Sequence, residues 1–335
     1  MKKSLAHYTV ALVCLLGFLT DLRAQDPQYS QFYSNQVMLN PAFTGAGIGP
    51  RIAMNYRAQW INIPGYYKQF SFSYDQPVNF LGTTQGLGVN FNSDVAGEGD
   101  LAKLNMTLNY SYQLELVEDE HFLHFGLSGG ITQASIDFYK LRFPDQIDPR
   151  DGFVRPTNEP ASLWSQSQVR PDVNAGLAYF NKYAWLGFTV NHITQPREQF
   201  SFPNLSVPYA ILPRKYTVTG GIKIPVQQMR NRREISISPV FLYKMQGEFT
   251  QIDGGLYVNA EPMVFGVWYR HQDAVIGLIG IQYGAFSFGY SYDYTIGDLT
   301  QSISGGSHEI SLNLQFEQPN RPRRMKHRSL PCPKF

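Results

Sequence analysis

Apolar and polar residues alternate with a period of two over long stretches of this chain. Such a pattern predicts β-strands whose two faces lie in different surroundings. In residues 286–295 Phe and Tyr alternate with Ser, Gly, Asp and Thr, and residues 308–317, 103–112 and 69–75 repeat the pattern. The polar face holds mostly Ser, Thr, Asn, Gln and Gly, whereas a soluble sandwich carries Lys and Glu on its outer face. Outer-membrane strands turn apolar side chains to lipid and small or polar ones to the lumen, so the alternation favours a membrane barrel.

About fourteen such runs occur, and bacterial barrels of this kind have an even number of strands. We expect the strands to begin near Arg51, Lys68, Gly86, Ala102, His121, Asp172, Tyr183, Tyr216, Glu234, Phe249, Met263, Val275, Phe286 and His308. The predicted fold is therefore all-β: a transmembrane antiparallel up-and-down β-barrel over residues 51–317.

Loop lengths give the barrel an orientation. If the first strand rises from the periplasm, the long connections 139–170, 194–215 and 296–307 all lie on the outer side, and short turns such as 181–182 and 259–262 lie on the inner side. Long extracellular loops and short periplasmic turns are the rule for these barrels. The same strand parity predicts a periplasmic leader over residues 25–50 and a basic periplasmic tail over residues 318–335.

The first 24 residues are typical of an export signal that is removed by cleavage. Lys2 and Lys3 precede an apolar run at residues 10–19, and Leu22-Arg23-Ala24 offers a cleavage site before Gln25. No later segment has 18 consecutive apolar residues, so no transmembrane helix is expected. Only 16% of the residues are charged, against about 25% in soluble domains, and the net charge of +2 gives no footprint for nucleic acid.

Residues suited to catalysis or metal binding are scarce. The seven histidines form no zinc-type cluster with Cys or carboxylates, and His121 and His124 beside acidic residues are better explained as a solvated turn. Asn191-His192 is similar to a catalytic pair of membrane phospholipases, but no nucleophilic serine motif accompanies it. We expect no enzyme activity, no cofactor and no metal. After cleavage Cys332 is the only cysteine, which excludes an internal disulfide.

Several short motifs are distributed along the chain: residues 25–33 (QDPQYSQFY), Asn40-Pro41-Ala42, Thr44-Gly45, Tyr56-Arg57, residues 73–77 (SYDQP), residues 291–294 (SYDY), residues 305–310 (GGSHEI) and the ending Cys332-Pro333-Lys334-Phe335. Together they resemble the PorP/SprF family, outer-membrane proteins of the type IX secretion and gliding machinery of the Bacteroidota. The resemblance covers essentially the whole mature chain.

The resemblance implies a barrel component that helps to export or anchor an adhesin-like surface protein with a C-terminal sorting domain. It also implies contacts with periplasmic components of the machinery and with the outer-membrane lipid around the barrel. The alternative is an outer-membrane porin or transporter for small or hydrophobic solutes, because a barrel of about fourteen strands is wide enough for a plugged channel.

Two groups of candidate site residues follow. The partner-binding candidates lie in the leader, the long outer loops and the tail: Tyr29, Phe32, Tyr33, Asn40, Pro41, Tyr139, Phe143, Trp164, Phe200, Phe202, Arg323, Arg324, Cys332 and Phe335. The alternation turns a second, polar group into the lumen: Arg57, Asp75, Asp293 and Glu309. Charges in a narrow lumen are costly without partners, so Arg57, Asp293 and Glu309 either pair with one another or line a water-filled path.

Overall fold

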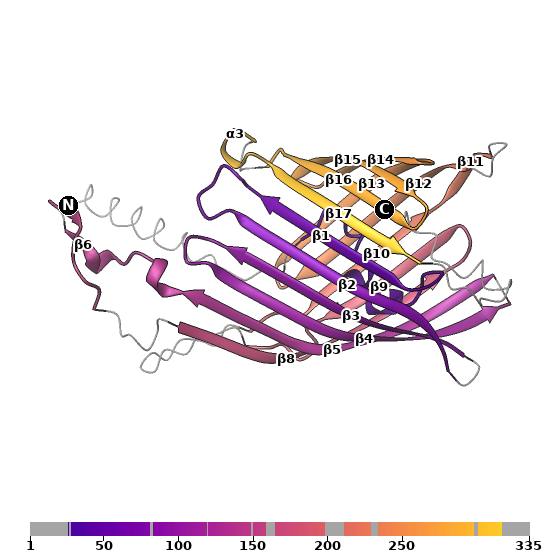
Figure 1. Cartoon of the computed structure of the whole chain (residues 1–335), viewed down its shortest axis with the longest axis horizontal. Coiled ribbons are helices and arrows are strands. Elements are labelled where there is room, and N and C mark those ends of the chain that lie inside the picture. The colour runs from indigo at the N-terminus through magenta and orange to yellow at the C-terminus, as the bar shows by residue number, and fades with distance from the viewer. Residues whose placement is uncertain are drawn as a thin grey trace, which may run out of the picture.

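A computed structural model describes residues 26, 28–80, 83–118, 120–148, 150–158, 165–197, 211–228, 234–297 and 301–316. The described strands form one closed antiparallel barrel, and neighbours in sequence are mostly neighbours in the wall (Figure 1). This confirms the predicted fold class.

Fourteen strand positions make up the wall. They are filled by β1 (Arg51–Gln59), β2 (Tyr67–Phe80), β3 (Thr83–Ala96), β4 (Leu101–Val117), β5 (His121–Asp137), β8 (Ser165–Phe180), β9 (Ala184–Asn191), β10 (Lys215–Ile222) with β11 (Ile224–Gln228), β12 (Glu234–Gln246), β13 (Phe249–Ala260), β14 (Met263–Arg270), β15 (Ala274–Tyr283), β16 (Phe286–Thr295) and β17 (Ser307–Gln315). The largest departure from the expected starts is β8, which begins at Ser165 rather than near Asp172.

Two pairings complete the closed wall. The first and last strands pair over their whole length, from Arg51 opposite Gln315 to Gln59 opposite Ser307. At the other seam β10 and β11 both pair with β12, and the register shifts between Pro225 and Gln227. Because β10 and β11 lie end to end along the same neighbour, they share one strand position.

The short elements outside the wall are α2 (Gln36–Leu39), η1 (Pro41–Phe43), η2 (Phe138–Lys140), η3 (Pro144–Gln146), β6 (Ile147–Asp148), β7 (Gly152–Phe153) and α3 (Gln301–Ser304). Figure 1 shows the connection with β6 extending well beyond one end of the barrel, the same end at which α3 lies. Among the described residues, no helix is long and apolar enough to cross a bilayer.

Side chains alternate across the wall as the sequence pattern predicts. In β16 the odd positions Ser287, Ser291 and Asp293 are buried inside, while Phe286 and Phe288 lie on the outer surface. Large apolar side chains cover the outside of the barrel; Leu108 is 70% exposed and Val267 62%. An outer surface of this kind suits contact with lipid rather than water.

The leader lies in a place that strand parity did not predict. We expected residues 25–50 outside the barrel, but the described part, residues 26 and 28–50, runs through the lumen and is named here the lumen segment. Parity counts crossings of the wall, so it places Pro50 at the inner end but says nothing of a stretch inside the barrel. A lumen lined by polar side chains needs partners for them, and the lumen segment supplies many.

Candidate functional site

The lumen segment packs against opposite sides of the barrel interior in different ways. Its aromatic side chains meet an apolar surface on β12 to β15. Phe32 is 5.1 Å from Trp268 between ring centroids, and Tyr33 is 4.9 Å from Tyr257; both pairs meet edge to face. These rings are all buried, with Leu242, Ile276 and Leu278 in the same cluster. On this side the lumen is a packed hydrophobic core rather than a water-filled channel.

Farther along, a tight turn of the lumen segment lies directly against the wall. Asn40 caps the short helix η1 through its side chain and donates from Nδ2 to the carbonyl oxygens of Leu177 (3.1 Å) and Phe188 (3.3 Å). A Cβ at Gly176 would lie 2.0 Å from Asn40 Oδ1, and one at Gly126 would lie 2.1 Å from the Ala42 nitrogen. The wall therefore carries glycine where the lumen segment approaches most closely.

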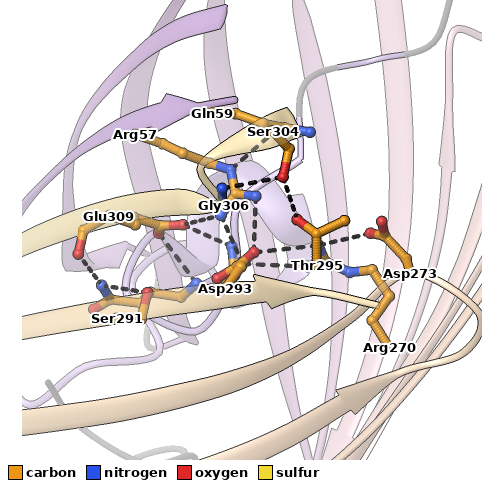
Figure 2. Close-up of polar contacts among 12 residues, drawn as sticks. Arg57, Gln59, Arg270, Asp273, Ser291, Asp293, Thr295, Ser304, Gly306 and Glu309 are labelled. Carbon is orange, nitrogen blue, oxygen red and sulfur yellow. Dashed lines mark hydrogen bonds and ion pairs between the residues drawn. The ribbon is translucent and has the colours of Figure 1, made fainter. Parts of the chain in front are cut away.

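An ion-pair network joins the lumen segment to both ends of the wall's sequence. Arg57 Nη2 lies 2.8 Å from Asp293, and Arg57 Nη1 lies 3.4 Å from Glu309 (Figure 2). Ser30 lies among them: its nitrogen donates to Glu309 (2.7 Å), and its hydroxyl donates to Asp293 (2.6 Å) and accepts from Arg57 (2.7 Å). Arg270 adds a second cation 3.4 Å from Asp293. All these side chains are almost fully buried.

A second buried pair anchors the end of the lumen segment next to β1. Arg51 Nε contacts Asp75 Oδ1 at 2.9 Å, and Asp75 Oδ2 accepts from the Gly45 nitrogen at 2.7 Å. Gln36 bonds the same guanidinium. Arg57, Asp75, Asp293 and Glu309 are all buried inside the barrel. Arg57 pairs with Asp293 and Glu309, and Asp75 pairs with Arg51.

The opposite end of the lumen segment is held by a charge cluster at the middle of β8 and the outer ends of β9 and β10. His192 contacts Asp26 through Nε2 (2.8 Å) and Asp172 through Nδ1 (2.9 Å), and Lys215 bonds Asp26 as well. We call these four residues the outer latch. Sequence reasoning missed it, although Asp26 is the only charged residue in residues 25–50.

Electrostatics keep two members of the outer latch, His192 and Asp26, ionised. Burial alone lowers the pKa of His192, but the charge of Asp26 and the hydrogen bonds to Asp172 and Asp26 outweigh it and raise the pKa from 6.5 to about 9. Burial alone raises the pKa of Asp26, but the charges of His192 and Lys215 hold it well below its usual value. Both ring nitrogens of His192 face carboxylates, so this side chain joins Asp26 of the lumen segment to Asp172 of β8.

The other predicted partner-binding residues are dispersed. Tyr29, Phe32, Tyr33, Asn40 and Pro41 are buried in the lumen and unavailable to a partner in this conformation. Tyr139 is 69% exposed in the β5–β8 connection, where Phe143 is half-buried. The remaining candidates lie outside the described residues: Trp164, Phe200, Phe202, Arg323, Arg324, Cys332 and Phe335.

No group of three or more His, Cys, Asp or Glu side chains able to hold a metal occurs in the part of the chain that the structure describes. The interior is organised instead around amide, hydroxyl and paired charged groups. Such an arrangement binds and positions polar groups.

Comparison with known proteins gives a family and a set of similar barrels. Residues 22–314 match the family described as "Type IX secretion system membrane protein PorP/SprF". No curated protein matches the chain. Among solved structures, a TodX monoaromatic hydrocarbon channel mutant (TM-score 0.45, 10% identity, 83% of this chain and 92% of that one) and the CymD monoaromatic hydrocarbon channel (0.44, 13%, 85% and 93%) are similar. The β-domain of the Bordetella autotransporter BrkA is also similar (0.36, 12%, 80% and 99%).

Proposed function

Because the chain belongs to the PorP/SprF family of type IX secretion system membrane proteins, we propose that it is a non-enzymatic barrel that binds a surface protein and helps to export or anchor it. The protein is an outer-membrane component of that machinery. Its cargo would be an adhesin-like protein with a C-terminal sorting domain. The proposal also includes export of the barrel itself by a signal peptide that is cleaved after residue 24.

The filled lumen is the observation that supports docking over passage of cargo. The lumen segment is bonded to β1, β2, β3, β8, β9, β16 and β17 and packed against β12 to β15. A folded sorting domain would have to displace all of these contacts to enter. Binding at the outer loops requires no such displacement.

The β5–β8 connection offers the clearest docking surface among the described loops. It carries the β6–β7 hairpin, and the apolar side chains Tyr139, Phe153 and Val154 are 69%, 45% and 61% exposed. Exposed aromatic side chains rimmed by polar residues are typical interface anchors. Periplasmic components would contact the inner turns and the tail with Arg323, Arg324, Cys332 and Phe335.

Affinity purification from native envelopes, followed by mass spectrometry, tests this proposal. We expect secretion components and a surface adhesin to co-purify with the wild-type chain. The double variant Tyr139→Ala/Phe143→Ala should lose the adhesin but keep the periplasmic components. Tyr283→Ala, which removes an 82% exposed aromatic at an inner turn, is the matched control and should keep the adhesin. Recovery of neither class of partner would refute the proposal.

The solute-channel alternative is separated by conductance in planar bilayers. A packed core on one side of the lumen and ion pairs across it predict a closed barrel with no stable current. A steady solute-permeable pore in the wild-type chain would favour the porin or transporter function instead.

A further inference from the structure

Four polar side chains gather beside the outer latch, on the inner surface of β9, β10 and β12 near their outer ends. Lys215 lies opposite Asn191 of β9, and Thr217, two residues farther along β10, lies opposite Lys244 of β12. Residues directly opposite on antiparallel strands have Cβ atoms about 4.5–5.5 Å apart, and residues two apart on one strand share a face. The four side chains therefore form one group, named here the Lys244 cluster.

Lys244 is a cation of this cluster that the protein leaves unpaired. Its ammonium forms no hydrogen bond and no ion pair among the described residues. The two carboxylates that act on it, those of Asp26 and Asp253, bond other groups. Asp26 bonds Lys215, and Asp253 lies 3.5 Å from Arg270. A charge turned into the lumen without a partner is costly, so this ammonium requires a counter-ion or another polar partner.

The other members of the cluster add donors to this charge. The Thr217 hydroxyl and the Asn191 side-chain amide form no hydrogen bond within the described chain. Lys215 keeps two of its three N–H groups after it bonds Asp26. N–H and O–H groups from three strands therefore converge beside an unpaired cation, and donors of this kind bind anions.

The cluster borders a hollow of about 40 Å³ between the wall and the lumen segment. The lumen segment closes it from the other side with Tyr29, Phe32, Asn35, Met38 and Leu39. One water molecule needs about 10–15 Å³ of such space. The hollow therefore has room for an ion of the size of chloride together with one or two waters.

The local charges favour one sign and one valence. The outer latch is neutral, because it joins two cations to two carboxylates. Lys244 adds one positive charge beside it, and Asp253 shares its negative charge with Arg270. One monovalent anion balances that charge, whereas a second negative charge would be left without a partner.

We infer that the Lys244 cluster binds a small monovalent anion of the size of chloride. Lys244 and Lys215 supply charge, and Thr217 and Asn191 supply further donors. The ion lies between the wall and the lumen segment, so its binding stabilises the docked segment. The inference goes beyond the proposed function, because it holds whether or not the barrel docks a surface protein.

Chloride NMR line widths on the full chain test the inference, in an amine-oxide detergent with gluconate as the background anion, because gluconate is too large for the hollow. Exchange between bulk chloride and a protein site broadens the line, and we expect millimolar bromide to reverse this broadening in the parent. Lys244→Met should reduce the broadening at least tenfold, since it removes the charge and its hydrogen bond to the ion. Lys182→Met, which removes an exposed lysine at the β8–β9 turn, is the matched control and should match the parent. Absence of bromide-reversible broadening in the parent, or equal broadening in Lys244→Met, would overturn the inference.

Thermal unfolding distinguishes a lost ion from a damaged barrel. At constant ionic strength, chloride in place of gluconate should raise the unfolding temperature of the parent and of Lys182→Met, because an ion that binds only the folded state stabilises it. Lys244→Met should show no such rise. In gluconate Lys244→Met should unfold no lower than the parent, because it removes a charge that has no partner in the protein. A lower unfolding temperature of Lys244→Met in gluconate would mean that the protein itself holds Lys244, and it would also overturn the inference.

Discussion

Removing the ring of Phe32 should release the lumen segment while leaving the barrel wall intact. Phe32 is 5% exposed and packs edge to face against Trp268 and Tyr33, at 5.1 and 5.6 Å between centroids. Truncation of a buried Phe to Ala costs about 3–5 kcal/mol. Each 1.4 kcal/mol is a factor of about ten, so the undocked fraction should rise roughly a hundredfold or more. The wall loses no strand pairing, because Phe32 lies outside every strand.

A cysteine reporter at Ser34 measures that fraction. Ser34 is 2% exposed, and its hydroxyl bonds Asn55 and Asn313 at 3.0 Å each, so Ser34→Cys is nearly isosteric and labels only when the segment opens. In a Cys332→Ser background the labelling rate by a hydrophilic maleimide follows the open population. Phe32→Ala should accelerate labelling about a hundredfold. Phe288→Ala on the lipid-facing side is the matched control. Equal rates in both variants would refute a docked lumen segment.

The same contacts lead to three further predictions. Gly126→Ala should lower the thermal unfolding temperature in detergent, because its Cβ would lie 2.1 Å from the lumen segment. Gly129→Ala in the same strand has nothing within 4 Å of the added Cβ and should leave that temperature unchanged. Equal unfolding temperatures for the two variants would contradict the close approach. Arg57→Met leaves buried Glu309 without its cation and Asp293 with Arg270 alone, so it should cost about 3–5 kcal/mol in denaturant unfolding. An unchanged midpoint would argue against the network. The raised pKa of His192 means that its protonated form stabilises docking fully below pH 6.5 and that this contribution is lost as the pH rises through about 9. Labelling of the Ser34→Cys reporter should accelerate over that pH range, and Asp26→Asn should remove this pH dependence. A labelling rate in the parent protein that does not change with pH would count against the outer latch.

Much of the wall could be predicted from the sequence because a strand's period of two leaves a local signal. Residues 286–295 and 308–317 alternate between aromatic or aliphatic residues that face lipid and small polar residues that face inward, and β16 and β17 follow that pattern. The start of β8 was placed late. Residues 165–171 hold polar residues on both faces, so nothing there marks a strand that continues beyond the membrane-facing part.

The position of the lumen segment could not be predicted, because its contacts are distant in sequence and its own pattern has no period. Ser30 meets Glu309 and Asp293 only after the wall closes. Two indirect signals were present nevertheless. Inward positions such as Trp268 and Ile276 are apolar, which a water-filled lumen does not require, and inward Gly126 leaves space for a second chain segment.

The contacts of the lumen segment also bear on how the barrel closes. Ser30 and Gln31 bond β16 and β17, Ser34 bonds both β1 and β17, and Asn35 bonds β3. A segment that holds the first and last strands at once brings the two edges of the sheet together, so it favours the β1–β17 pairing as well as filling the lumen. The N-terminal segment is therefore as much a part of the barrel's core as the wall itself.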